Sequence, residues 1–176
     1  MKRPSITIVE TPRLRLRPFN RDDGDNLFQL YSDAEVMRYV GKGARTHAET
    51  DAALSATLAH WNHHGFGIWA VEDRGDGRFL GRCGLRYFQD TPDVELSYTF
   101  GKETWGKGMA TEAAGASVRF GFVDLGLERI LAIAIPENVG SWRVMEKIGM
   151  RREGTGVYFG VEHVRYVISR HDYQPV

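Results

Sequence analysis

The sequence predicts an α/β fold in which a mixed, mostly antiparallel central sheet of about six or seven strands is flanked by helices. Two observations indicate this class. Short strand-like runs follow one another from residue 66 to residue 100, with a Gly-Asp-Gly turn at Gly75 to Gly77. Elsewhere, segments with apolar residues at helical spacing alternate with strand-like segments. The 176 residues contain no repeat or linker, so we expect a single domain over residues 1–176.

The first part of the chain alternates and then turns helical. Apolar and polar residues alternate over residues 14–19, which predicts a strand closed by Pro18. Capping residues open a helix over residues 20–32, and the apolar spacing over residues 36–40 predicts a second short helix. Thr46 begins a Thr-x-x-Glu capping box, which predicts an alanine-rich helix to about residue 63.

The rest of the chain is dominated by strand signals, interrupted by two helices. A meander over residues 66–100 is followed by the first of these helices, which reads as long and apolar. In order, we expect strands at 66–72, 79–85 and 94–100, a helix at 106–122, a strand at 130–135, a helix at 138–148 stopped by Gly149, and closing strands near 151–158 and 162–169.

Composition disfavours several classes of protein. Basic and acidic residues both number 23, and a formal net charge of zero disfavours nucleic acid as a partner. The longest aliphatic run, Ile130 to Ile135, is too short to cross a membrane. The start, Met-Lys-Arg-Pro, lacks the apolar region of a secretory signal, so we expect a cytoplasmic protein. Cys83 is the single cysteine and is interpreted as inert core filler.

The most informative segment is Thr104-Trp105-Gly106-Lys107-Gly108-Met109-Ala110-Thr111-Glu112. Its two glycines let the backbone approach a ligand closely, and the helix that follows exposes unpaired N–H groups that suit phosphate oxygens. The segment matches neither the P-loop nor the dinucleotide fingerprint. Taken alone, a tight turn with close helix packing explains it equally well, and Lys107 either contacts a phosphate or is simply solvated.

This segment resembles the acyl-CoA pyrophosphate loop of the GNAT acetyltransferase superfamily, and three further stretches agree in order along the chain. Glu10-Thr11-Pro12-Arg13-Leu14-Arg15-Leu16-Arg17-Pro18 resembles the opening strand of the Rim-type (RimJ/RimL) branch, whose known members acetylate the amino termini of ribosomal proteins. Val94-Glu95-Leu96-Ser97-Tyr98 resembles the strand before the loop. Asn138-x-x-Ser141 through Lys147-x-Gly149-Met150 resembles the second conserved helix. Trp105 stands where the superfamily often has Gln or Arg, and this marks the Rim-type branch.

The resemblance implies an N-acetyltransferase that uses acetyl-CoA, needs no metal, and transfers the acetyl group to a primary amine by direct attack in a ternary complex. It also implies that the sheet opens between the strands at 94–100 and 130–135, where acetyl-CoA enters. The branch implies a protein N-terminal α-amine as acceptor and a homodimer. A small-molecule amine (an antibiotic, a polyamine or an amino acid) and a non-catalytic acyl-CoA-binding module are the alternatives. No nucleic acid or membrane partner is expected. The cofactor-binding residues implied are Tyr98, Phe100, Trp105, Gly106, Lys107, Gly108, Met109, Ala110, Thr111, Asn138 and Ser141.

Two residues are the candidate catalytic groups. Glu95 lies on the polar face of its strand, where a solvated or ion-paired side chain is the local interpretation, and the resemblance implies a general base. Asn138 and Ser141 are explained locally as helix-start residues. By resemblance they contact the pantetheine arm, and Ser141 helps to protonate the departing thiolate. The family's usual helix tyrosine is absent, which leaves Tyr158 and Tyr166 as alternatives for that role. The oxyanion donor is expected to be a backbone N–H near residues 96–98.

The remaining histidines and aromatic residues are discounted. His60, His63 and His64 could suggest metal ligands, but no carboxylates accompany them, so a solvated helix end is expected. His163 lies on a closing strand, near the expected acceptor end. Trp61, Phe66 and Trp69 are assigned to the core or to a pocket wall.

Overall fold

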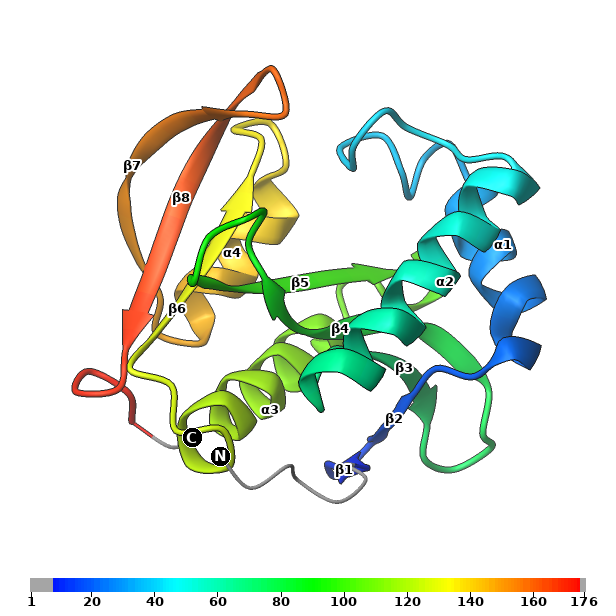
Figure 1. Cartoon of the computed structure of the whole chain (residues 1–176), viewed down its shortest axis with the longest axis horizontal. Helices are drawn as coiled ribbons and strands as arrows, with labels where there is room; N and C mark the ends of the chain where they lie inside the picture. Colours follow the sequence, from blue (N-terminus) through cyan, green and yellow to red (C-terminus); the bar gives the residue numbers. More distant parts are fainter. Residues whose placement is uncertain (1–7, 175–176) are drawn as a thin grey trace.

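The computed structural model describes residues 8–174 and is built on an eight-stranded sheet (Figure 1). The strand order is β1-β2-β3-β4-β5-β6-β8-β7, and every neighbouring pair is antiparallel except β5 and β6. The strands are β1 (Val9–Glu10), β2 (Leu14–Pro18), β3 (Ile68–Asp73), β4 (Phe79–Tyr87), β5 (Val94–Phe100), β6 (Arg129–Ala134), β7 (Arg151–Tyr158) and β8 (Val161–Ser169). The predicted fold class is therefore confirmed. The sequence missed β1, because its two residues carry no alternation. Met1 to Pro4, which carry the expectation of no secretory signal, lie outside the described residues.

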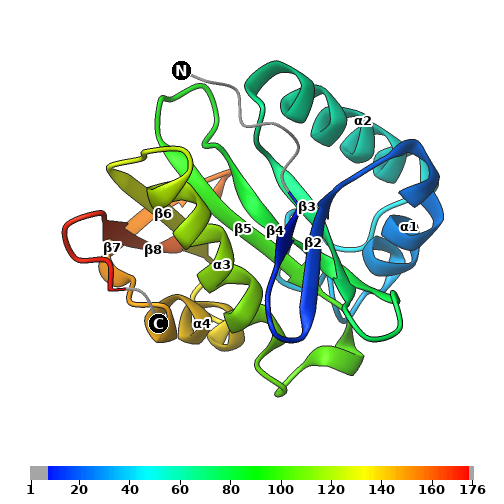
Figure 2. The same cartoon turned by 90° about the horizontal axis from the view of Figure 1, so that it is seen from below.

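Helices cover both faces of the sheet (Figure 2). The α-helices are α1 (Gly24–Ser32), α2 (His47–His64), α3 (Met109–Val123) and α4 (Val139–Lys147), with 3₁₀ turns η1 (Arg21–Asp23) and η2 (Lys102–Thr104). α1 and α2 lie on one face, and α3 and α4 lie on the other, where they pack against each other. Across residues 8–174, no helix is long and apolar enough to span a membrane.

The capping signals in the sequence are confirmed, and one helix prediction is wrong. Thr46 and Glu49 form a reciprocal capping box at the start of α2. The predicted helix over residues 36–40 is instead a series of turns held by isolated hydrogen bonds, such as Met37 N to Asp33 O at 3.0 Å. So short a segment cannot recover the cost of helix nucleation, and Gly41 follows it with a positive φ of 55°.

The core divides between the two faces of the sheet. One cluster lies under α3 and α4 and includes Trp69, Cys83 and Phe120, whereas a smaller cluster lies under α1 and α2. The interpretation of Cys83 as core filler is confirmed, because the residue is fully buried and this burial raises the pKa of its thiol to about 12. Trp69 belongs to the core as expected, and Trp61 packs against it from α2.

The sheet opens at its middle, between β5 and β6. These two strands run parallel and share one pair of partners, Glu95 with Leu131. Beyond that pair they diverge, as Figure 1 shows. The predicted opening is therefore present, and it separates the half built from β1 to β5 from the half built from β6 to β8.

Candidate active site

A cavity of about 540 Å³ lies between the end of β5, the glycine-containing turn before α3, and the start of α4. Ten of the sequence-predicted site residues line it. These are Tyr98, Phe100, Trp105, Gly106, Gly108, Met109, Ala110, Thr111, Asn138 and Ser141. Two predicted site residues, Glu95 and Lys107, are not among its lining residues. The cavity therefore joins segments that are about forty residues apart along the chain.

The turn before α3 presents backbone rather than side chains to this cavity. Gly106 and Gly108 have left-handed φ angles of 72° and 76°, which glycine adopts without strain. A Cβ added at Gly106 would have no described atom within 4 Å, so the backbone faces open space. Trp105 is 48% exposed, and its Nε1 donates to Phe100 O at 3.0 Å, which fixes the indole ring beside the turn.

The first turn of α3 has the features of an anion site. No described side chain caps its N-terminus, so the N–H groups of Met109, Ala110 and Thr111 carry no intrahelical or side-chain partner. Those N–H groups and the helix dipole together favour phosphate oxygens. Because these residues also line the cavity, a pyrophosphate fits there without a cationic side chain at the turn itself.

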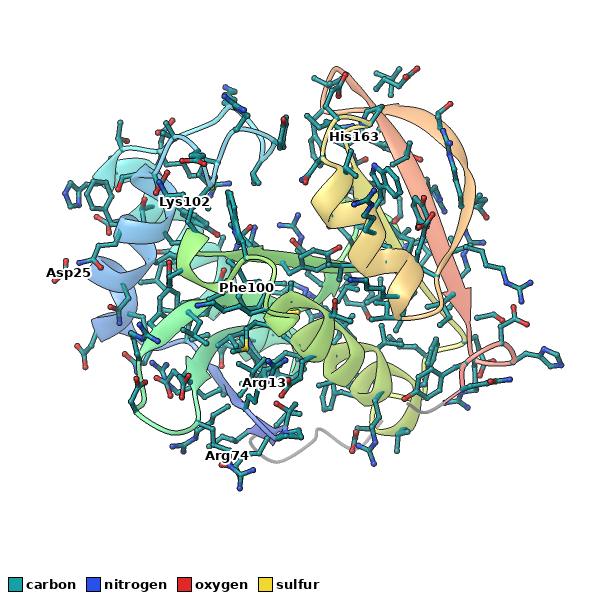
Figure 3. All side chains as sticks on the ribbon, turned by 180° about the vertical axis from the view of Figure 1, so that it is seen from behind. Arg13, Asp25, Arg74, Phe100, Lys102 and His163 are labelled. Atoms are coloured by element: carbon teal, nitrogen blue, oxygen red, sulfur yellow. The ribbon has the colours of Figure 1, made fainter. Side chains whose placement is uncertain are left out.

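The ion pair between Arg13 and Glu112 stabilises this turn. Arg13 Nε donates to Glu112 Oε2 at 2.6 Å, and Arg13 Nη1 donates to Lys107 O at 2.9 Å (Arg13 is labelled in Figure 3). Thr11 Oγ1 also donates to Glu112 Oε1, at 2.6 Å. Burial raises the pKa of the Glu112 carboxyl, but these hydrogen bonds and the Arg13 charge outweigh it and lower that pKa. The carbonyl of Lys107 is thus held by Arg13, and the N–H of Lys107 donates to Thr104 O at 3.3 Å, so both backbone groups are fixed within the turn.

Alanine at Gly108 is expected to weaken binding of the acetyl-CoA that the sequence resemblance implies, because the left-handed conformation costs an L-residue about 1–2 kcal/mol. Relaxation of the turn should raise the KM for acetyl-CoA by about 5- to 30-fold, with kcat unchanged at saturation. Initial-rate kinetics measure both quantities.

Gly115 provides the matched control for this substitution. It lies in the same helix, where an added Cβ would meet Ile148 Cγ2 at 4.0 Å. Gly115→Ala should leave the KM for acetyl-CoA unchanged. An equal effect of both substitutions would mean that the Gly108 conformation does not shape the binding site.

The start of α4 meets β5 through a pair of hydroxyl groups. Asn138 Oδ1 accepts from Ser141 N at 3.2 Å, so the local interpretation of Asn138 as a helix cap is confirmed. Ser141 Oγ donates to the Tyr98 hydroxyl at 3.2 Å, and that hydroxyl donates to Ser141 O at 2.7 Å. Burial raises the pKa of the Tyr98 phenol, which therefore keeps its proton at neutral pH.

The other tyrosines considered from the sequence lie elsewhere. Tyr158 receives a hydrogen bond from Arg165, and Tyr166 donates to Glu146; neither is among the residues that line the cavity. His163 is on the exposed side of β8, with Nδ1 at 2.9 Å from Val161 O (Figure 3). The hydroxyl groups nearest to the start of α4 are thus those of Ser141 and Tyr98.

Glu95 lies where the pairing of β5 with β6 stops. It is 5% exposed, and its Oε2 accepts from Arg86 Nε at 2.9 Å, so the local interpretation of an ion-paired glutamate is confirmed. The other carboxylate oxygen makes no hydrogen bond within residues 8–174. One oxygen of this carboxylate is thus free of described partners at the point where β5 and β6 separate.

The backbone N–H of Tyr98 points toward the opening. Gly101 N donates to Leu80 O on β4, and hydrogen-bonding direction alternates along an antiparallel strand. The groups of Thr99 therefore face β4, whereas those of Tyr98 face the β6 side. Since β6 contributes only the pair at Glu95, no β6 residue is paired with Tyr98.

The sequence analysis missed part of the cavity wall. Arg38 from the turns after α1, and Arg143 and Lys147 from α4, bring three cationic residues to it. The spacing of Arg143 and Lys147, one helical turn apart, was a signal that could have indicated a shared face. On the other wall, Lys102 Nζ pairs with Asp33 and Glu35 at 3.2 and 3.0 Å, which holds the turns over residues 33–40 beside η2 (Figure 3).

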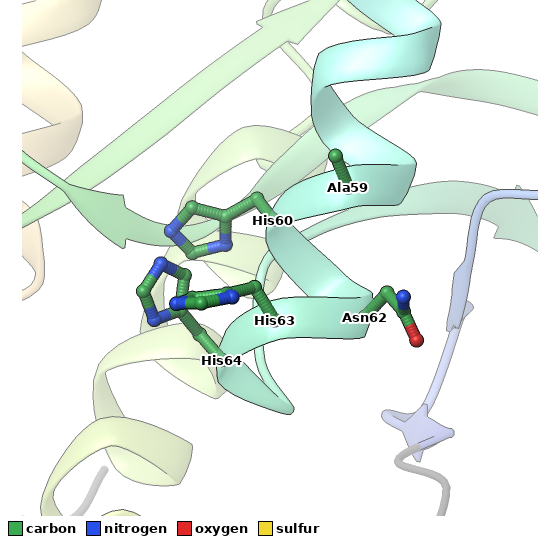
Figure 4. Close-up of a pocket in the computed structure, with 5 residues that line it drawn as sticks. All are labelled: Ala59, His60, Asn62, His63 and His64. Atoms are coloured by element: carbon green, nitrogen blue, oxygen red, sulfur yellow. The ribbon is translucent and has the colours of Figure 1, made fainter.

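A second hollow, at the end of α2, is formed largely by histidines (Figure 4). The expectation of a solvated helix end is wrong for His60, because its Nδ1 lies 2.9 Å from Phe66 O and its Nε2 accepts from Tyr87 N at 3.3 Å. These contacts require a neutral ring with the proton on Nδ1. Among the described residues, no group of three or more His, Cys, Asp or Glu is placed to hold a metal.

Acidification is expected to destabilise the fold through His60. Burial, followed by the positive charges of His64, Arg86 and His63, lowers the pKa of His60 below its ordinary value, despite the bond to Phe66 O. Stability from the neutral ring is therefore complete above the unfolded pKa of about 6.5 and is lost as the pH falls below it. The Tm should fall by a few degrees between about pH 7.5 and pH 5.5.

His60→Gln should reduce this dependence of the Tm on pH, and His171→Gln, which changes a histidine whose side chain is 97% exposed, should not. Equal slopes of Tm against pH for His60→Gln and the unmodified protein would contradict the assignment. Thermal melts at both pH values provide the comparison.

The fold and the cavity define a transferase class. A sheet that opens beside an uncapped helix N-terminus, with a glycine turn and hydroxyl groups at the opening, suits a phosphate-bearing cofactor whose arm enters between two strands. The model of the acetyltransferase (GNAT) domain family matches residues 13–151. The chain belongs to the GNAT family and is an acetyl-CoA-dependent N-acetyltransferase.

Similar proteins agree with this assignment. The Bacillus subtilis protein named uncharacterized N-acetyltransferase YnaD is 33% identical over 146 residues, which are 83% of this chain and 84% of YnaD. The crystal structure of a GNAT-family acetyltransferase from Bacillus anthracis has a TM-score of 0.83 at 29% identity, and the match covers 94% of this chain and 99% of that one. The GNAT resemblance seen in the sequence is therefore confirmed.

More distant matches differ in their acceptors. Spermidine N(1)-acetyltransferase of Escherichia coli K12 is 28% identical over 80% of this chain and 74% of its own length. The ribosomal-protein-S5-alanine acetyltransferase of Vibrio fischeri has a TM-score of 0.78 at 19% identity, covering 96% of this chain and all of that one, and it shares the fold alone. The family is thus shown, whereas the Rim-type branch is not, because a structural similarity at so low an identity shows the fold alone.

Proposed function

We propose that this enzyme transfers the acetyl group of acetyl-CoA directly to a primary α-amine, with both substrates bound at once. The observation that carries the proposal is the position of the uncapped start of α3 and the Ser141–Tyr98 hydroxyl pair on one cavity, next to the opening between β5 and β6. One end of that cavity suits the pyrophosphate and the other suits the thioester. Acetyl-CoA supplies the activated acetyl group. All chain residues, 1–176, are taken as one acetyltransferase domain.

The chain's own groups bind the cofactor in sections. The N–H groups of Gly108 to Thr111 hold the pyrophosphate, and the basic residues Arg143 and Lys147 neutralise the remaining phosphate charge. Asn138 and Ser141 are placed along the pantetheine arm. Trp105 and Phe100 supply apolar wall at the turn. Lys107 contributes through its backbone, because its carbonyl is held by Arg13 and its side chain does not line the cavity.

Glu95 is proposed as the general base. Only a neutral amine attacks a thioester, and an α-amine with a pKa near 8 is already partly neutral at physiological pH. The carboxylate oxygen of Glu95 that is not held by Arg86 accepts the remaining proton, directly or through one water. The Arg86 pair fixes the orientation of the carboxylate at the base of the opening.

Two further groups are proposed for the acyl end of the site. The Tyr98 N–H, which points toward the opening, donates to the carbonyl oxygen as negative charge develops on it. The Tyr98 hydroxyl turns from Ser141 O to give its proton to the departing thiolate, Ser141 Oγ passes its own proton along the existing hydrogen bond to the Tyr98 oxygen, and solvent re-protonates Ser141. Tyr98 therefore has a backbone role and a side-chain role in the same step.

The test is release of free thiol from acetyl-CoA with a panel of amines, with the mass of each product recorded. The panel contains Ala- and Ser-initiated peptides, free amino acids, ε-lysine peptides, polyamines and aminoglycosides. Release with α-amines supports the proposal. Release confined to polyamines would move the function toward that of the spermidine relative, and acetyl-CoA binding without release for any amine would indicate a non-catalytic binding module.

We further propose a cytoplasmic setting and a homodimer. The buried, unpaired Cys83 supports the first. The second is taken over from the branch resemblance, and sedimentation of the purified chain tests it.

A further inference from the structure

Arg82 of β4 is a buried cation without an anionic partner in the part of the chain that the structure describes. The residue is 7% exposed, and Nη1 donates to Ser97 Oγ at 3.0 Å, while Nε has no hydrogen-bond partner among those residues. No carboxylate lies within 4.0 Å of this guanidinium among residues 8–174. A buried charge that is not paired is costly. Burial accordingly lowers the pKa of the Arg82 guanidinium, which stays protonated because its ordinary value is so high.

A second guanidinium shares the same aromatic ring. Arg82 Cζ lies 5.5 Å from the centre of the Tyr31 ring, and Arg45 Cζ lies 4.4 Å from it. Arg45 is half-buried and makes no ion pair within the described residues. Tyr31, from α1, is itself buried. The guanidinium groups of Arg82 and Arg45 thus both contact the Tyr31 ring, and among the described residues neither has a negative charge in contact with it.

The position of Arg82 connects it to the proposed acceptor site. Arg82 and Thr99 are directly opposite partners on β4 and β5, so their side chains share one face of the sheet. Thr99 Oγ1 is also buried without a partner, and Thr99 lines the cavity. Glu95, Ser97 and Thr99 alternate along that same face of β5. The proposed base and the unpaired guanidinium therefore lie along one short strip, on the side of the sheet away from α3.

We propose that the acceptor is an α-amino acid, and that Arg82, with Arg45 and the Thr99 hydroxyl, binds its carboxylate while the amine faces Glu95. This inference rests on the proposed function, and it selects among α-amines. A guanidinium matches the two oxygens of a carboxylate, and a hydroxyl adds a further donor. An α-amino acid carries its amine and its carboxylate on one carbon, which suits a strip only a few residues long. A polyamine offers no anion and is repelled by the two guanidinium groups.

For each side chain, the test compares three acceptors: the amino acid, its carboxamide, and the amine formed by its decarboxylation. Several side chains, small and large, are used so that pocket size does not decide the result. The kcat/KM of the acid should exceed that of both analogues by at least about thirtyfold for the preferred side chain. Equal values, or faster reaction of the carboxamide or the amine, would overturn the inference while leaving acetyl transfer itself intact.

Variants separate recognition from folding. Arg82→Met should lower the kcat/KM of the acid to about that of the carboxamide, leave the Kd of acetyl-CoA unchanged, and keep or raise the Tm, because an unpaired buried charge is lost. Arg45→Met, outside the sheet, should reduce the preference in part and serves if Arg82→Met does not fold. Arg129→Met, which removes a strand arginine paired with Glu153 in the other half of the sheet, is the control and should leave the preference intact.

Loss of rate with all three acceptors alike in Arg82→Met would overturn the inference and assign Arg82 a structural role. Failure of every amine to react in the unmodified enzyme, with acetyl-CoA still bound, would overturn the proposed function as well. The two failures are therefore distinguishable.

Discussion

Replacing Glu95 with glutamine is expected to lower kcat by about 10²- to 10⁴-fold and to leave the Kd of acetyl-CoA nearly unchanged. Glutamine keeps the shape of the side chain and can still accept from Arg86, but it cannot take a proton from the amine. The residual rate should rise steeply with pH, because solution must then supply the neutral amine. Steady-state rates across pH, with acetyl-CoA affinity measured by calorimetry, give both quantities.

The control for this variant is Glu153→Gln. Glu153 is also a strand glutamate paired with an arginine, since Arg165 Nε lies 2.7 Å from its Oε2, but it does not line the cavity. Its kcat should stay within a small factor of the unmodified enzyme. Unchanged turnover in Glu95→Gln with both substrates saturating would remove Glu95 from the mechanism.

The largest loss of stability is expected for Trp69→Ala, at about 3–5 kcal/mol. Trp69 is fully buried, and its ring packs edge-on against Phe120 of α3 at 5.0 Å and against Trp61 of α2 at 5.6 Å. Truncation therefore leaves a cavity, because β3, α2 and α3 cannot all move inward to fill the space of the indole ring. Chemical denaturation, followed by fluorescence and circular dichroism, measures the change in the free energy of unfolding.

Val123→Ala is the matched surface control. Val123 ends α3 and is 59% exposed, so its truncation should change the free energy of unfolding by no more than about 0.5 kcal/mol. A similarly small effect for Trp69→Ala would mean that this ring does not hold α2 and α3 against the sheet.

Much of the fold was predictable because its signals are local. The Thr46 capping box, the alternation over residues 94–100 and the stop at Gly149 each depend on a few consecutive residues, and the structure has all of them. The segment over residues 36–40 failed because apolar spacing alone cannot show that so few residues form a helix. His60 failed for a different reason: its partners, Phe66 and Tyr87, are set by how α2 meets β4.

The candidate site was predictable in part. The glycine turn and the start of α4 are local motifs, so the sequence could indicate residues that the cavity brings together. The brace from Arg13 to Lys107 joins residues 94 positions apart, and no local pattern marks it. The missing partner of Arg82 could not be foreseen either, because whether a charge is paired depends on every side chain around it.

The single pair of partners between β5 and β6 has a mechanical consequence. The two halves of the sheet lack the continuous ladder that would couple them, and α3 adds a second connection through its contacts with α4 and β6. A molecule that contacts both β5 and α4 links the two halves. Because it binds only the native state, its binding free energy adds to the free energy of unfolding of both halves together. The substrates therefore enter where the two halves of the sheet are held together least, between β5 and β6. A bound substrate then stabilises the native state against separation of the two halves.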